Sequence, residues 1–162
     1  MNIGTSRDTS EFACDSLRYW WYNRGRYDYP NATKLLILAD GGGSNGSRNY
    51  VFKQALQKLA NRIGIDIRIA HYPPYTSKWN PIEHRLFCHV TRSLSGMLLD
   101  SHELIKHLIK KTETESGLIV KANIIDKIYE TGRKVSAEFK NNMGIVFDEY
   151  LPKWNYTAKC MS

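Results

Sequence analysis

A chain of 162 residues is long enough for one domain with a substantial core, and 42% hydrophobic and 24% charged residues are typical of a globular protein. The formal net charge of +7 suits a polyanionic partner such as nucleic acid, although many basic proteins bind none. No apolar run is long enough to cross a membrane, the first residues lack signal-peptide features, and the three cysteines form no C-x-x-C pair. We therefore expect a cytoplasmic protein with reduced thiols.

The first expected helix covers residues 8–24. Asp8 and Glu11 have the spacing of a capping box, and Gly25 is expected to end the helix. The apolar face of this helix should contain Ala13, Leu17, Trp20 and Trp21. We interpret the tandem tryptophans as core residues rather than as a platform for stacking bases.

A βαβ unit is predicted next. Residues 34–39 form a continuous apolar run, which predicts a strand buried on both faces. That strand ends at Asp40, and the glycine-rich segment 41–47 follows. A helix over 48–63 and an alternating strand over 65–70, nearer the sheet edge, complete a parallel pair.

Adjacent prolines then exclude regular structure, and a helix begins at Asn80 by the usual rules. Asn80 is the expected N-cap, Pro81 the first helical residue and Glu83 a first-turn acid. A further amphipathic helix is expected over 101–111. Beyond it the patterns are weaker: they favour a strand over 118–120, short helices over 124–129 and 136–142 and a tail at 154–156.

Asp40 and Glu83 are the candidate metal ligands. Asp40 ends a buried strand, where open α/β sheets bind ligands, and one βαβ excursion can bring Glu83 to the same edge. Two hard carboxylates there suit Mg²⁺ or Mn²⁺, and a metal pair supports phosphodiester displacement. Two simpler readings stay open: Asp40 caps the glycine-rich turn, and Glu83 is an acid favoured at a helix start.

Two other sites are disfavoured. Gly41, Gly43 and Gly46 match a dinucleotide-binding pattern, but the preceding Asp40 would repel a pyrophosphate and no acid ends the next strand. We therefore expect no nucleotide cofactor. His84 and Cys88 can share a helix face, but too few further ligands lie nearby for zinc.

Two long segments, 36–46 and 71–87, resemble the ISAzo-type insertion-sequence transposases. The Asn-Pro-Ile-Glu segment within the second is also similar to the last motif of mariner-like DDE transposases. Shorter matches to the ISAzo type lie at 4–21, 112–122 and 154–156, so the resemblance covers nearly the whole chain.

The resemblance implies an α/β, ribonuclease H-like fold in which three acids bind two Mg²⁺ or Mn²⁺ ions. It makes Asp40 the second acid and Glu83 the third, and it implies DNA cleavage and strand transfer on element ends and target DNA. A homo-oligomer assembled on DNA is compatible with it. Residues in the matching motifs that would support the acids or contact DNA are Asn45, His71, Lys78, Asn80, His84 and Arg85.

The sequence departs from the family pattern at its start. The first acid of the family precedes the first long helix, where this chain has only residues 2–5. We therefore expect residues 1–162 to form a partial catalytic domain, truncated at the N-terminus. Residues 1–99 would hold the helix, the βαβ unit and the Glu83 helix, and residues 100–162 a mixed extension.

Truncation would have two consequences. The strand over 34–39 would expose an apolar edge, making the isolated chain marginally stable or prone to aggregation. Two acids would also bind metal poorly, so little cleavage is expected. Whether the chain itself is an enzyme is left open, the alternative being a catalytically inactive nucleic-acid-binding remnant.

Overall fold

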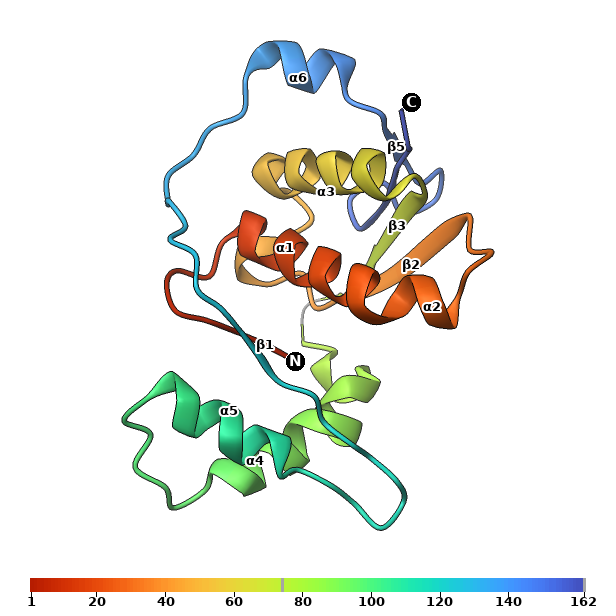
Figure 1. Ribbon diagram of the computed structural model, residues 1–162. Helices are drawn as coiled ribbons and strands as arrows, with labels where there is room; N and C mark the ends of the chain where they lie inside the picture. Colours follow the sequence, from red (N-terminus) through yellow and green to blue (C-terminus); the bar gives the residue numbers. More distant parts are fainter. Residues whose placement is uncertain (74, 162) are drawn as a thin grey trace. The chain divides into compact units, whose positions relative to one another are not determined.

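The computed structural model describes residues 1–73 and 75–161 and is mixed α/β (Figure 1). It contains two compact units. The helical unit comprises residues 1–7 and 75–128, and the sheet unit comprises residues 8–74 and 129–162. The expected division of the family's catalytic domain into residues 1–99 and 100–162 stays a prediction. No helix among the described residues is long and apolar enough to cross a membrane.

The sheet unit is built on four strands in the order β2-β3-β6-β5. The strands are β2 (Lys34–Ala39), β3 (Asp66–His71), β5 (Ile145–Phe147) and β6 (Asn155–Ala158). β2 and β3 are parallel, and the other neighbours are antiparallel. The helices are α1 (Ser10–Trp20), the π-helical turn η1 (Trp21–Gly25), α2 (Arg26–Asp28), the 3-10 turn η2 (Gly43–Asn45), α3 (Tyr50–Ile63) and α6 (Ala137–Asn142).

The predicted βαβ unit is confirmed. β2 and β3 pair in register from Lys34 opposite Asp66 to Ala39 opposite His71, and α3 connects them. α3 begins two residues later than expected because the Asn49 side chain caps it. Gly64 ends it as expected, at a φ of 75° that suits glycine.

The predicted burial of the two parallel strands was wrong. β2 lies at the sheet edge, with Leu36 and Leu38 60% and 53% exposed, whereas Ile67 and Ile69 of β3 are fully buried. The cause is β6: the segment expected to be a tail pairs with β3 and makes β3 central. The expected exposure of apolar side chains along the 34–39 strand is therefore present.

The start of α1 differs from the prediction by one residue. The N-cap is Thr9, whose Oγ1 accepts a hydrogen bond from the Phe12 amide at 3.2 Å. Asp8, the expected cap, instead accepts a hydrogen bond from the Ser44 hydroxyl at 3.0 Å. Glu11 pairs with Arg133. The predicted capping box was therefore wrong, since both of its acids bind other side chains.

Gly25 does not end the first helix, as was expected. The chain continues through η1 into α2, with Gly25 at a helical φ of −53°. A Cβ on Gly25 would lie 2.8 Å from the Trp21 ring and 2.9 Å from the Trp20 ring, so the packed indoles require glycine here. Trp21 is buried as predicted, but Trp20 is 36% exposed.

α1 and α3 pack together on one face of the sheet and enclose the main core (Figure 1). Its largest fully buried side chains are Leu56, Ile67, Ile69 and Tyr156. Tyr156 comes from β6, so a segment late in the sequence completes the core around the βαβ unit.

The helical unit contains one small sheet and a second core. β1 (Asn2–Gly4) and β4 (Asn123–Ile125) pair in parallel. The other elements are η3 (Ser77–Trp79), the π-helical turn η4 (Glu83–Phe87), α4 (Cys88–Leu94) and α5 (His102–Lys110). The buried core residues of this unit are Val90, Ile109, Val120 and Ala122.

The C-terminal predictions had mixed outcomes. The helices expected over 101–111 and 136–142 are confirmed as α5 and α6, each capped by its serine, Ser101 or Ser136. The helix expected over 124–129 was wrong, because β4 pairs with β1 there. The strand expected over 118–120 is limited to one bridge between Glu113 and Ile119.

The two faces of β2 lead to a prediction on stability. We expect Ile37→Thr, which places a hydroxyl against the core, to lower the free energy of unfolding by about 2 kcal/mol. Leu36→Thr, one residue away on the exposed face, should change it by less than about 0.5 kcal/mol and should reduce self-association. Urea unfolding and light scattering measure both effects. Equal destabilisation by the two variants would contradict the prediction.

Candidate functional site

Asp40 is exposed at the carboxyl end of β2, at the start of the glycine-rich turn. Its Oδ1 accepts a hydrogen bond from the Gly42 amide at 3.2 Å. Gly41 and Gly43 adopt φ values of 75° and 53°, which glycine adopts without strain. Asp40 thus caps the glycine-rich turn, as the simpler reading expected, but this hydrogen bond occupies only one carboxylate oxygen. The other, Oδ2, has no hydrogen-bond partner among the described residues.

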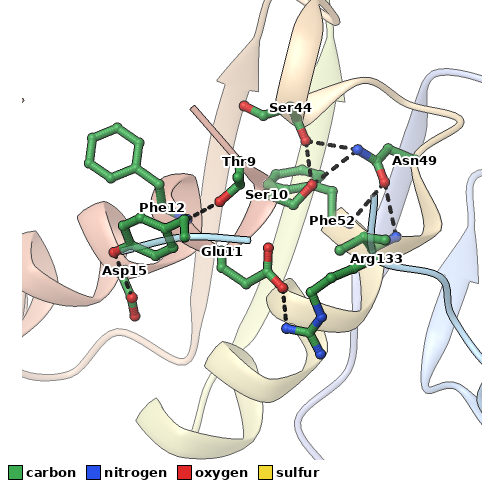
Figure 2. Close-up of polar contacts among 11 residues, drawn as sticks. Thr9, Ser10, Glu11, Phe12, Asp15, Ser44, Asn49, Phe52 and Arg133 are labelled. Carbon is green, nitrogen blue, oxygen red and sulfur yellow. Dashed lines mark hydrogen bonds and ion pairs between the residues drawn. The ribbon is translucent and has the colours of Figure 1, made fainter. Parts of the chain in front are cut away.

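The starts of α1 and α3 anchor the glycine-rich turn (Figure 2). The Ser44 carbonyl accepts hydrogen bonds from Ser10 Oγ at 2.7 Å and from Asn49 Nδ2 at 3.1 Å. Asn49 Nδ2 also donates to Ser10 Oγ at 3.0 Å, while its Oδ1 accepts from the amides of Val51 and Phe52. One asparagine therefore caps α3 and holds the turn.

Neither Ser10 nor Asn49 was predicted from the sequence as a residue of this site. Asn49 carried a signal, since asparagine before an apolar helical pattern is a favoured N-cap. Ser10 carried none, because its role depends on α1 packing beside the turn, 34 residues away in sequence.

His71 fixes the turn from the β3 side, and it is 6% exposed. Its Nε2 lies 2.9 Å from the Asn45 carbonyl and its Nδ1 lies 2.6 Å from the Trp154 carbonyl. His71 therefore joins the turn, the end of β3 and the segment before β6.

Asn45 offers an oxygen that the fold does not use. Its side-chain Oδ1 is buried and has no hydrogen-bond partner among the described residues. With the open oxygen of Asp40, the same turn provides two hard oxygen donors of the kind that Mg²⁺ and Mn²⁺ prefer. The donor chemistry of the turn therefore fits a divalent metal.

Lys53 is a buried cation behind the turn. It is 3% exposed, and its Nζ donates to the Ser47 carbonyl. The Nζ lies 5.0 Å from the centroid of the Tyr50 ring and 4.7 Å from that of Tyr156. No carboxylate pairs with it among the described residues, and desolvation lowers its pKa from 10.5 to about 8.

In the helical unit, Glu83 lies at a helix start, as predicted. Asn80 Oδ1 accepts a hydrogen bond from the Ile82 amide at 3.4 Å, and the Glu83 amide donates to the Asn80 carbonyl at 3.1 Å. Asn80 is thus the expected N-cap. The Glu83 carboxylate is half-buried and has no hydrogen bond or ion pair among the described residues, so it is open to a cation.

The other predicted residues of this segment order its entry loop. His84 Nε2 donates to the Lys78 carbonyl at 2.8 Å, which ties the 3-10 turn η3 to the helix. The Lys78 ammonium lies 5.0 Å from the centroid of the exposed Trp79 ring, and Arg85 is exposed. In neither unit, over residues 1–73 and 75–161, do three or more His, Cys, Asp or Glu side chains gather as metal ligands.

A parallel βαβ unit whose first strand is followed by Asp40, together with an Asn-Pro-x-Glu helix start, fits the class of DDE transposase domains. The chain matches, over residues 1–160, the family described as the Rhodopirellula transposase DDE domain, and it belongs to that family. No curated protein and no solved structure matches it. Membership implies DNA as a partner, and the family generally uses a divalent metal.

The buried Lys53 leads to a prediction on pH dependence. Below pH 8, folded and unfolded chains both carry the proton. Between pH 8 and 10.5 the unfolded chain binds more protons at this site, so Lys53 makes stability rise with pH. Burial raises the pKa values of Cys14 and Tyr156, so above about pH 9 these two groups make stability fall with pH. The effect of Lys53 must therefore be measured as a difference between two proteins.

We therefore measure the free energy of unfolding of the wild type and subtract that of Lys53→Met. We expect this difference to rise from pH 8 to pH 10 in urea titrations. Lys58→Met, at an exposed position of the same helix, is the matched control and should give a flat difference. A flat difference for Lys53→Met as well would contradict the lowered pKa.

Proposed function

We propose that this chain acts in DNA transposition, with Asp40 and Glu83 as two of the carboxylates that bind Mg²⁺ or Mn²⁺ during DNA cleavage and strand transfer. The main support is Asp40 Oδ2, which has no hydrogen-bond partner among the described residues and lies at the carboxyl edge of the parallel β2–β3 pair. The family match includes both acids. The unpaired carboxylate of Glu83 supports it. A ribonuclease H-like fold is part of the proposal, supported by the mixed sheet.

Each proposed residue has a defined task. Asp40 and Glu83 hold the ions. The buried side-chain oxygen of Asn45, which has no hydrogen-bond partner among the described residues, lies in the same turn as Asp40. His71 holds the backbone of that turn, and Asn80 fixes the first turn of the Glu83 helix. Bound metal ions would stabilise the attacking and leaving oxygens of the phosphodiester displacement.

The DNA backbone needs cations rather than carboxylates. Arg85 and Lys78 are exposed within two to five residues of Glu83, and His84 orders the loop that carries Lys78. We assign phosphate contacts to Lys78 and Arg85 and an ordering role to His84. Phosphate contacts would make affinity fall steeply with salt.

Iron-directed cleavage of the protein tests the two ligands without requiring enzymatic activity. Fe²⁺ bound in place of Mg²⁺ generates hydroxyl radicals with ascorbate and peroxide and cuts the nearby backbone. We expect cuts near both residue 40 and residue 83, suppressed by excess Mg²⁺ and lost at both places in Asp40→Asn. Asp100→Asn, at an exposed acid outside both motifs, is the control and should cut as wild type.

Cuts near only one of the two residues would contradict a shared metal site. A chain that binds DNA with steep salt dependence but gives no Mg²⁺-suppressible cut would favour the alternative, a nucleic-acid-binding remnant without catalysis.

Nicking of supercoiled plasmid tests the chemistry itself. With two assigned acids we expect slow Mn²⁺-dependent nicking at most, because fewer charged ligands bind metal more weakly. Asp40→Asn should remove it while leaving DNA affinity within about twofold, since Asp40 contributes no phosphate contact. Nicking that persists in Asp40→Asn would overturn the assignment.

A further inference from the structure

The end of the first helix of the sheet unit presents two parallel rows of tyrosine and arginine. Side chains four residues apart lie one above the other on a helix, and these rows continue from α1 through η1 into α2. The first row is Arg18, Tyr22 and Arg26, and the second is Tyr19, Asn23 and Tyr27. We call these six residues the tyrosine–arginine face.

The core does not need this face. The same helix buries Cys14, Trp21 and Gly25 on its other side, where the helix meets the core. Tyr19, Tyr22 and Tyr27 are 41%, 36% and 65% exposed, so all three rings reach solvent. None of the three rings belongs to the main core.

The exposed side chains hold one another in place. The Arg26 guanidinium lies 5.3 Å from the centroid of the Tyr22 ring and 4.7 Å from that of Tyr27, and it donates to the Tyr27 hydroxyl at 2.6 Å. Asn23 Nδ2 donates to the Tyr19 carbonyl at 2.8 Å. The Tyr22 hydroxyl donates to the Arg62 carbonyl at 3.3 Å. Ordered rings lose little entropy when a ligand stacks on them.

The face is also hollowed and basic. A groove of about 360 Å³ is lined by four residues of the face, Arg18, Tyr19, Tyr22 and Asn23, and by Arg62. Arg18 has a carboxylate neighbour, Asp15, at 3.1 Å, whereas Arg26 and Arg62 have no carboxylate partner among the described residues. The groove therefore combines aromatic rings with uncompensated positive charge.

We propose that the tyrosine–arginine face binds single-stranded DNA, with unpaired bases stacked on Tyr19 and Tyr27 and with Arg26 and Arg62 on the phosphates. Alternating rings and cations are what sequence-tolerant single-strand binding requires, whereas duplex bases present no free faces to stack. The choice of DNA among polyanions rests on the proposed function. The face does not involve the metal-binding acids.

Charge argues against a second copy of the chain as the occupant. A two-fold interface through this face would bring arginine rows together, with Arg26 and Arg62 lacking carboxylates to pair with. The face also has a defined relation to the glycine-rich turn. Ser10 binds that turn at the other end of the helix, and the twelve residue steps from Ser10 to Tyr22 rise about 18 Å.

Fluorescence anisotropy with labelled oligo(dT) and the full chain tests the proposal. We expect Tyr27→Leu to weaken binding about tenfold, Tyr27→Phe to bind as wild type because the ring remains, and Arg26→Ala to weaken binding and flatten its salt dependence. Tyr150→Leu, an 85% exposed tyrosine of the same unit outside the face, is the matched control. Because Tyr27 is exposed, its replacement should leave thermal unfolding unchanged.

Three results would overturn the proposal: no oligo(dT) binding by wild type, wild-type affinity in a Tyr19→Leu, Tyr27→Leu double variant, or loss of self-association in that variant while oligo(dT) binding persists. The last would assign the face to a second copy. Asp40→Asn separates this proposal from the catalytic one: it should bind oligo(dT) normally. If the chain binds oligo(dT) through the face without metal but gives no iron-directed cuts, the single-strand proposal is supported and the metal site is contradicted.

Discussion

The sheet unit depends on how it holds one glycine-rich turn. The Ser44 carbonyl receives hydrogen bonds from α1 and α3, the Asn45 carbonyl meets His71 of β3, and the Ser47 carbonyl meets Lys53. Each anchoring side chain is at least partly buried, so losing one leaves an unpaired polar group that costs about 1–3 kcal/mol. Glycines let the chain follow the path, but side chains from three other elements choose it. Asp40 is positioned by this arrangement.

The anchors also tie the turn to the late part of the chain. His71 contacts the Trp154 carbonyl, and the Lys53 ammonium lies against the ring of Tyr156, which β6 buries in the core. A lysine buried without a carboxylate is unfavourable in its charged form, and the aromatic rings offset only part of that cost. The βαβ segment and the antiparallel β5–β6 pair form one core around these rings.

The first helix has a different role at each of its two ends. Its start fixes the glycine-rich turn through Ser10, and its end carries the tyrosine–arginine face. Gly25 makes the second possible, because the indoles pack where a side chain would stand and the helix continues as a π turn into α2. A stop at Gly25 would have left Arg26 and Tyr27 outside the helical rows.

Local sequence determined the parts whose causes are local. The apolar run at 34–39, the caps at Asn80 and Ser101 and the glycine at Gly64 each specify a nearby backbone state, and the two long motifs carried the family. Only tertiary structure decided that β2 lies at the edge and β3 at the centre, because β6 comes from more than 80 residues later. It also replaced Asp8 by Thr9 as the cap, since Asp8 has a partner in Ser44. Hydrogen bonds between distant segments leave no periodic trace in the sequence. The sequence could therefore propose Asp40 and Glu83, and the resemblance named His71, but neither pointed to Ser10 or Lys53 as side chains that hold the turn after Asp40.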